Sequence, residues 1–150
     1  MEQPETIMLN IVVADVDCTT SQALQMSRHA DPEQRRTILC VTKIDKVTGD
    51  GILEARISAI RQALGTGIPV FAVRNRTQQE NDDGLALTQA RELEDAYFAK
   101  LPSLAEEMKG VGALFKKLVQ LQLETIQHFT QYHKARQRLL VYCGKPFVKS

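Results

Sequence analysis

The first two-thirds of the chain alternates short apolar runs with amphipathic stretches. Three β-branched apolar runs predict buried strands of a parallel sheet, at residues 7–14, 37–41 and 70–73. Residues 22–29 predict a short helix that Asp31-Pro32 ends. A helically spaced apolar stripe predicts a second helix, carried by Leu53, Ile57, Ile60 and Leu64 and stopped by Gly65 and Gly67. Strands that alternate with helices predict βαβ units and therefore a parallel α/β sheet.

The last third of the chain has a mainly helical pattern. The polar residues 77–83 are expected to form a loop, which leads into a helix at about 84–100. Beyond Pro102, Ser103 and Glu106 have the spacing of a capping box. Residues 111–140 predict a long amphipathic helix that folds back on the sheet, with an apolar side marked by Leu114, Leu118, Leu121, Thr125 and Phe129.

The composition is that of an ordinary globular protein. The 150 residues fit one domain, and 43% apolar with 25% charged residues argues against disorder. Nineteen basic and eighteen acidic residues leave a net charge of +1, without the basic excess of a nucleic-acid binder. No apolar run approaches the roughly 20 residues of a membrane span, and the polar residues 1–5 do not resemble a secretory signal.

Cysteine usage favours a cytoplasmic protein without a metal centre. Cys18, Cys40 and Cys143 are odd in number and widely spaced, which fits neither a disulfide framework nor a zinc knuckle. Cys40 lies in an apolar run and is expected to pack as a small hydrophobic residue. The three histidines have no partners at metal-ligand spacing, so no metal site is expected.

The candidate chemistry lies where the second and third strands end. Thr42-Lys43-Ile44-Asp45 follows the second strand, and Asn75-Arg76-Thr77-Gln78 comes shortly after the third. Ligands of open parallel sheets bind beyond the carboxyl ends of the strands. An ionised Asp45 can accept from the two adjacent donors of guanine, whereas adenine presents an acceptor at N1. The Lys43 stem can lie along the base, and Asn75 can contact its other edge or join the two loops. This pattern predicts a guanine-base site.

Other interpretations are open at this level. Lys43 and Asp45 can be a solvated loop pair, with Asn75 a turn residue. The chain can also be a flavodoxin-like or other small α/β binder, although no glycine-rich turn follows the first strand. Asp15 and Asp17 are compatible with a Mg²⁺ site of phospho-acceptor type, but such residues more often cap the helix that follows.

These motifs and their surroundings resemble the dynamin family of large GTPases, including its Mx-like members. The resemblance runs from about residue 5 to residue 129 and rests on residues 5–17, 31–32, 36–38, 42–45 and 73–78. It implies a partial, doubly wound P-loop-NTPase-type sheet of about three parallel strands with flanking helices, followed by the long helix. Thr42, Lys43 and Asp45 match the family's fourth guanine-nucleotide motif. Asn75 and Arg76 match the fifth motif, in which Thr77 stands where many members have Ser. The nucleotide-binding residues that the resemblance implies are Thr42, Lys43, Ile44, Asp45, Asn75, Arg76, Thr77 and Gln78.

The phosphate-handling motifs of such a GTPase do not occur in these 150 residues. No glycine begins a GxxxxGK[S/T] loop, since Gly144-Lys145-Pro146 lacks the upstream glycine and the hydroxyl residue. There is no DxxG segment either. Phosphoryl transfer depends on positioning and charge around the γ-phosphate. No catalytic residue is therefore expected, and Mg²⁺ is expected only together with a phosphate-binding half.

The sequence predicts the guanine-nucleotide-binding portion of a dynamin-like GTPase, with GTP or GDP as its ligand. Residues 1–110 would be the C-terminal part of the GTPase domain, and 111–150 a helix toward a bundle signalling element and stalk with a divergent tail. The resemblance also implies self-association, a cytoplasmic or peripheral-membrane location, membrane remodelling and microtubule binding. The alternative is a catalytically silent module that binds full-length dynamin-like proteins through its C-terminal helix. An unpaired sheet edge further predicts a marginally stable or oligomeric chain.

Overall fold

The computed structural model describes residues 6–15, 21–47, 51–64 and 67–143. Three parallel strands form one sheet in the order β1-β2-β3, namely β1 (Met8–Val13), β2 (Thr37–Thr42) and β3 (Val70–Ala72). The predicted parallel α/β sheet is confirmed, and it is consistent with part of a P-loop-NTPase-like fold. Asp17, Cys18, Gly65 and the tail 144–150 lie outside the described residues.

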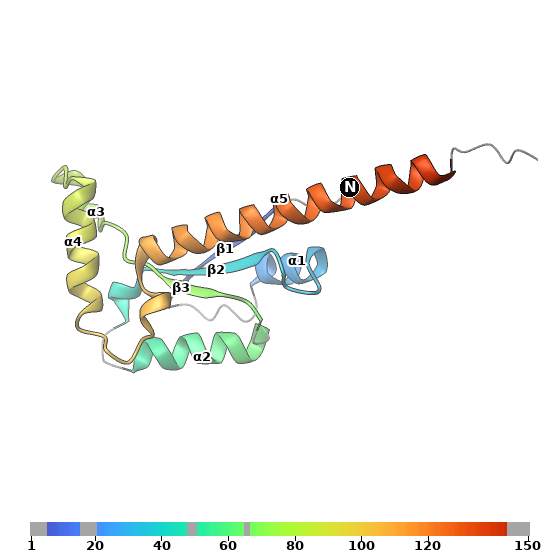
Figure 1. The fold of residues 1–150 in the computed structure, drawn as a ribbon. Helices are drawn as coiled ribbons and strands as arrows, with labels where there is room; N and C mark the ends of the chain where they lie inside the picture. Colours follow the sequence, from blue (N-terminus) through green and yellow to red (C-terminus); the bar gives the residue numbers. More distant parts are fainter. Residues whose placement is uncertain (1–5, 16–20, 48–50, 65–66, 144–150) are drawn as a thin grey trace, which may run out of the picture.

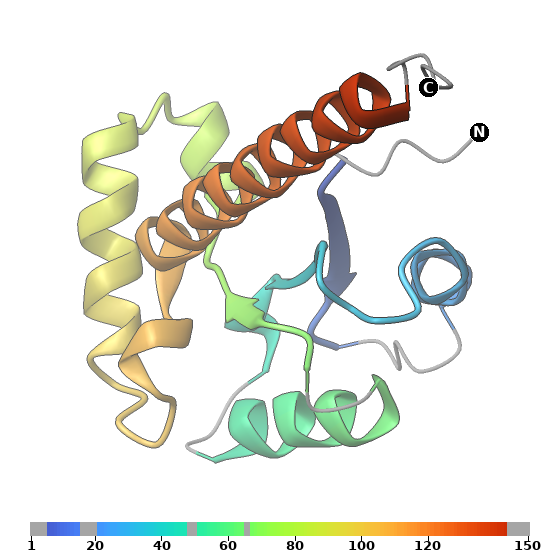
Figure 2. The same cartoon turned by 45° about the vertical axis from the view of Figure 1, so that its right-hand side comes forward.

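Helices cover both faces of the sheet and its carboxyl end. They are α1 (Gln22–Ala30), α2 (Ile52–Leu64), α3 (Gln78–Asp82), α4 (Leu87–Phe98) and α5 (Gly110–Cys143), with short 3-10 turns η1 (Ile44–Lys46) and η2 (Glu106–Met108). The long α5 crosses one face, and α2 lies under the other (Figures 1 and 2). Figure 1 shows α4 beside the end of the sheet where η1 and α3 follow the strands. Helix α4 therefore lies beside the carboxyl ends of the strands, where the candidate loops begin.

The central strand β2 explains why the sheet has a core on each side. All six of its residues are buried, and successive side chains of a strand point to opposite faces. Leu39 and Val41 join one cluster, and Ile38 and Cys40 join the other. The prediction that Cys40 packs as a small hydrophobic residue is confirmed. Burial, with the negative charge of Glu94 adding to it, raises the pKa of the Cys40 thiol to about 11.

The two predicted apolar stripes face these two clusters. Leu53, Ile57 and Ile60 of α2 are buried against the first cluster, while the side chain of Leu64 lies outside the described part. On the other face, Leu114 and Leu121 of α5 pack against the second cluster, formed with Ile38, Cys40, Phe71 and Val73. The expectation that the long helix folds back on the sheet is confirmed for this first half of α5.

The turn between α1 and β2 is organised by one carboxylate. Asp31 ends α1, as predicted, and is 5% exposed. It accepts hydrogen bonds from the Arg36 N–H at 2.8 Å, the Arg35 N–H at 3.2 Å and the Thr37 hydroxyl at 2.8 Å. Burial alone would raise the pKa of Asp31, but these donors outweigh it, and the pKa lies below its ordinary value.

Two local expectations in the last third are wrong. Residues 77–83, expected to be a loop, contain the helix α3, because Thr77 and Glu80 form a capping box at its N-terminus. The capping box expected with Ser103 at the N-cap is also misplaced, because the N-cap position of η2 is Ala105. The Glu106 carboxylate instead pairs with the Lys109 ammonium.

Candidate functional site

The end of the sheet brings the two candidate loops together. β2 and β3 are parallel and paired, with Val41 opposite Ala72, and the Val73 N–H donates to the Val41 carbonyl at 2.9 Å. The chain therefore leaves both strands at the same edge, with Thr42-Lys43 beside Arg74-Asn75. This is the arrangement expected of residues that follow neighbouring parallel strands.

The loop after β2 is anchored at its start by Thr42, the last residue of the strand, and by the buried Ile44. The buried Thr42 hydroxyl donates to the Val12 carbonyl at 3.0 Å. Lys43 has φ 54° and ψ 40°, a left-handed conformation that turns the chain into η1. Ile44 is fully buried, whereas Lys43 is exposed and Asp45 is half-buried. Solvent therefore reaches the Lys43 amine and the Asp45 carboxylate, the two groups of this loop that the sequence predicts for the base.

The loop after β3 is anchored by ion pairs and caps. Asn75 and Arg76 are exposed, and the Arg76 guanidinium donates to the Leu85 carbonyl at 2.7 Å. Thr77 accepts from the Glu80 N–H at 3.3 Å and donates its own N–H to Glu80 at 2.8 Å. Gln78, the first residue of α3, donates to Asp82 at 2.9 Å. Thr77 and Gln78 thus shape the start of α3.

Glu80 also secures the residue that precedes this loop. Its carboxylate forms a 2.6 Å ion pair with Arg74, whose side chain is 12% exposed. The hydrogen bond from Arg74, followed by that from the Thr77 N–H, lowers the pKa of Glu80. The carboxylate is therefore ionised at neutral pH and holds the two ends of the Arg74–Thr77 stretch together.

Helix α4 contacts both loops, which the sequence did not reveal. The Tyr97 hydroxyl donates to the Ile44 carbonyl at 2.8 Å, in the loop after β2. The Glu94 carboxylate accepts from the Arg74 N–H at 2.9 Å, at the loop after β3. Burial, followed by the charge of Asp45, raises the pKa of Tyr97, while the charge of Arg74 opposes the rise. Both loops therefore converge on one side of α4.

The acidic pair after β1 is described only in part. Asp15 pairs with the Lys46 ammonium at 3.4 Å, while Asp17 lies outside the described residues. In the described ranges, no group of three or more His, Cys, Asp or Glu side chains could hold a metal ion. None of the described helices combines the length and apolarity of a membrane span.

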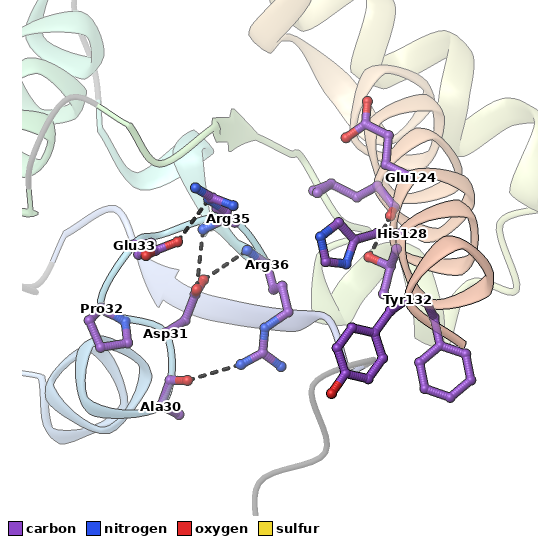
Figure 3. A pocket seen from close by; sticks show the side chains of 12 residues that line it. Ala30, Asp31, Pro32, Glu33, Arg35, Arg36, Glu124, His128 and Tyr132 are labelled. Carbon is purple, nitrogen blue, oxygen red and sulfur yellow. Dashed lines mark hydrogen bonds and ion pairs between the residues drawn. The ribbon is translucent and has the colours of Figure 1, made fainter. Parts of the chain in front are cut away.

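Two cavities lie away from the candidate loops. One, of about 750 Å³, opens between the Asp31–Arg36 turn and α5, and Figure 3 shows His128 and Tyr132 of α5 on its far side. The other, of about 790 Å³, lies between β3, η2 and the first half of α5. Neither is lined by Asp45 or Asn75.

The fold and its loops define the class: an α/β chain with part of a P-loop-NTPase-like parallel sheet. It is 31% identical over 145 residues to the Dynamin-1-like protein of Mus musculus, covering 93% of this chain and 19% of that protein. It is 35% identical over 130 residues to the Interferon-induced GTP-binding protein Mx2 of Oncorhynchus mykiss, covering 83% of this chain and 20% of that protein.

A plant relative extends this similarity. The chain is 33% identical over 129 residues to Dynamin-related protein 4C of Arabidopsis thaliana, covering 84% of this chain and 18% of that protein. No family model matches the chain. By these similarities the chain belongs to the dynamin family, and it spans about a fifth of the length of the curated relatives it matches.

Proposed function

We propose that this chain is the guanine-nucleotide-binding portion of a dynamin-like GTPase and that the loops after β2 and β3 hold the base. The observation that carries the proposal is the convergence of both loops on α4, where the Tyr97 hydroxyl donates to the Ile44 carbonyl and the Glu94 carboxylate accepts from the Arg74 N–H. The name of the trout relative, a GTP-binding protein, agrees with this assignment.

The half-buried Asp45 and the exposed Lys43 and Asn75 each have a role that fits guanine. The Asp45 carboxylate is a pure acceptor and suits the adjacent N1–H and amine donors of the base. The stem of Lys43 offers apolar contact to the base plane, and its ammonium can reach the ribose. The exposed Asn75 amide suits the opposite base edge. Thr42 and Ile44, both buried, shape the first loop, and Arg76, Thr77 and Gln78 shape the second.

The proposal assigns base recognition to this chain and no hydrolysis. The two loops supply contacts to a base, whereas phosphoryl transfer requires charge stabilisation around the γ-phosphate. We therefore expect phosphate release from GTP and Mg²⁺ to stay at the uncatalysed background with the 150-residue chain. Turnover above that background would contradict this part of the proposal.

The base specificity of Asp45 is the direct test. Asp45→Asn replaces an acceptor oxygen with a donor, and xanthine carries a carbonyl where guanine carries its amine. We expect the variant to lose about tenfold or more in affinity for GDP and to gain affinity for xanthosine diphosphate. Calorimetric titration measures both, with Asp95→Asn, an exposed position on α4, as the control. An unchanged preference would contradict the assignment.

The second candidate is an interaction module that binds a full-length dynamin-like protein through α5. It is supported by apolar side chains of α5 that do not pack on the sheet: Phe115 is 64%, Leu123 55% and Ile126 54% exposed. Phe115→Ser with Leu123→Ser should abolish co-sedimentation with the full-length Dynamin-1-like protein and leave GDP affinity unchanged. Membrane remodelling, microtubule binding and a cytoplasmic or peripheral-membrane location remain proposals that follow from the resemblance to the dynamin family.

A further inference from the structure

We propose that Glu94 is a positioning residue for the guanine-base loops, and that its carboxylate joins the loop after β3 to the first turn of α5 as one unit. This inference rests on the proposed base site. Glu94 lies on α4, outside both loop motifs, so α4 would take part in positioning the base loops. This inference also predicts that a change at the start of α5 alters nucleotide affinity.

The first support is the bonding of the two carboxylate oxygens. One accepts from the Arg74 N–H at 2.9 Å, immediately before Asn75. The other accepts from the Val111 N–H at 3.2 Å, in the first turn of α5. The first N–H groups of a helix have no hydrogen-bond acceptor within that helix. The Glu94 carboxylate of α4 is the acceptor for one of these groups in α5. A single side chain therefore fixes two backbone segments that are far apart in sequence.

The second support is burial. Glu94 is 4% exposed, although it projects from a helix whose neighbouring residues Glu92, Leu93 and Asp95 are exposed. A buried acidic side chain without donors is costly, and here the donors are the two backbone amides of the segments it joins. Removing the carboxylate would take away the acceptor of both amides, in hydrogen bonds that are partly shielded from solvent.

The third support is the backbone at Gly110. Its φ of 79° is a left-handed conformation that favours glycine, and a Cβ at this position would lie 3.2 Å from the Glu94 Oε2 atom. The chain therefore turns closely around the carboxylate at the first residue of α5. Tyr97, three residues after Glu94 and on the same side of α4, holds the other base loop through the Ile44 carbonyl. Both base loops are therefore bonded to α4. Through Glu94, the loop after β3 is also joined to the first turn of α5.

Amide hydrogen exchange, measured residue by residue in the full 150-residue chain, tests whether Glu94 joins the loop after β3 to the first turn of α5. Glu94→Gln leaves one accepting oxygen for two donors, so exchange at Arg74 or Val111 should accelerate about tenfold or more. Leu39, whose N–H donates to the Pro69 carbonyl, reports global opening and should stay unchanged. Glu92→Gln, on the exposed side of α4, is the matched control and should change none of these amides. Wild-type exchange at both Arg74 and Val111 in Glu94→Gln would overturn the proposal.

A second variant keeps the test valid if Glu94→Gln does not fold. Val111→Pro removes the N–H that donates to Glu94, and proline is tolerated in the first turn of a helix. We expect faster exchange at Arg74 and a several-fold loss of GDP affinity, although Val111 is not in the base loops. Unchanged exchange at Arg74 would overturn the link. If GDP does not bind the wild-type chain, the proposed function fails, and the exchange data still decide the role of Glu94.

Discussion

The carboxyl end of the sheet and the flank of β1 differ in how completely the chain covers them. At the carboxyl end, the loops after β2 and β3 are bonded to α4 by Tyr97 and Glu94. On the β1 flank, Leu9 is 40% and Ile11 64% exposed. These two lie opposite Ile38 and Cys40, whose face α5 covers. The chain therefore supplies its own support for the candidate site and leaves apolar surface beside β1.

The largest expected difference concerns stability. Leu39→Ala empties a fully buried position of β2 and should lower the free energy of unfolding by about 3 to 5 kcal/mol. Ile11→Ala, one strand away, should change it by about 0.5 kcal/mol or less. Urea unfolding followed by circular dichroism measures both. Equal losses at the two positions would show that the β1 flank is covered as fully as the centre.

The turn at the opposite end of β2 should respond to pH. Because the folded pKa of Asp31 is below its ordinary value, its stabilisation is present above the unfolded pKa of about 3.9 and is lost as pH falls through the folded pKa. Asp31→Asn should therefore cost about 2 kcal/mol at pH 7 and less below pH 4. Unfolding titrations across this range test it, with the exposed Glu33→Gln as control. A cost independent of pH would contradict the account.

The bond between Tyr97 and the loop after β2 should have a smaller effect. Tyr97→Phe removes the donor to the Ile44 carbonyl and should cost about 1 kcal/mol of unfolding free energy. The loss should be accompanied by weaker GDP binding, since Asp45 follows Ile44 directly. Thermal unfolding and calorimetric titration measure the two effects. Tighter GDP binding by Tyr97→Phe would show that the hydroxyl does not support the loop.

The smallest change in stability is expected on the β1 flank itself. Leu9→Gln with Ile11→Gln should leave the unfolding free energy within about 0.5 kcal/mol while reducing the concentration-dependent association that an uncovered apolar edge favours. Sedimentation velocity over a range of concentrations measures association. Met26→Gln, at a position of α1 that is 66% exposed, is the control. A wild-type chain that stays monomeric would count against this prediction.

The parallel sheet was predictable because its signals are local. The apolar run at 37–41 and the stripe of Leu53, Ile57 and Ile60 have the periods of a buried strand and an amphipathic helix. The helix α3 was missed although Thr77 and Glu80 have capping-box spacing, because the surrounding residues are uniformly polar. The sequence contained the signal, and the polarity of residues 77–83 concealed it.

The residues of α4 that hold the two candidate loops were not predictable from the sequence. Lys43, Asp45 and Asn75 are recognisable because they follow strands at fixed spacing. Glu94 and Tyr97 belong to a helix whose pattern indicates an exposed polar side, and their partners Arg74 and Ile44 are distant in sequence. Only the packing of α4 against the end of the sheet assigns them a role.

Amide chemical shifts during a GDP titration report whether the loops after β2 and β3 hold the base. The account predicts saturable shifts centred on residues 42–45 and 75–78, with smaller shifts at Arg74 and Val111 through Glu94. Residues of the cavity between the Asp31–Arg36 turn and α5, such as His128 and Tyr132, should not shift. Saturable shifts centred on that cavity, or no shift in either base loop at saturating GDP, would contradict the account.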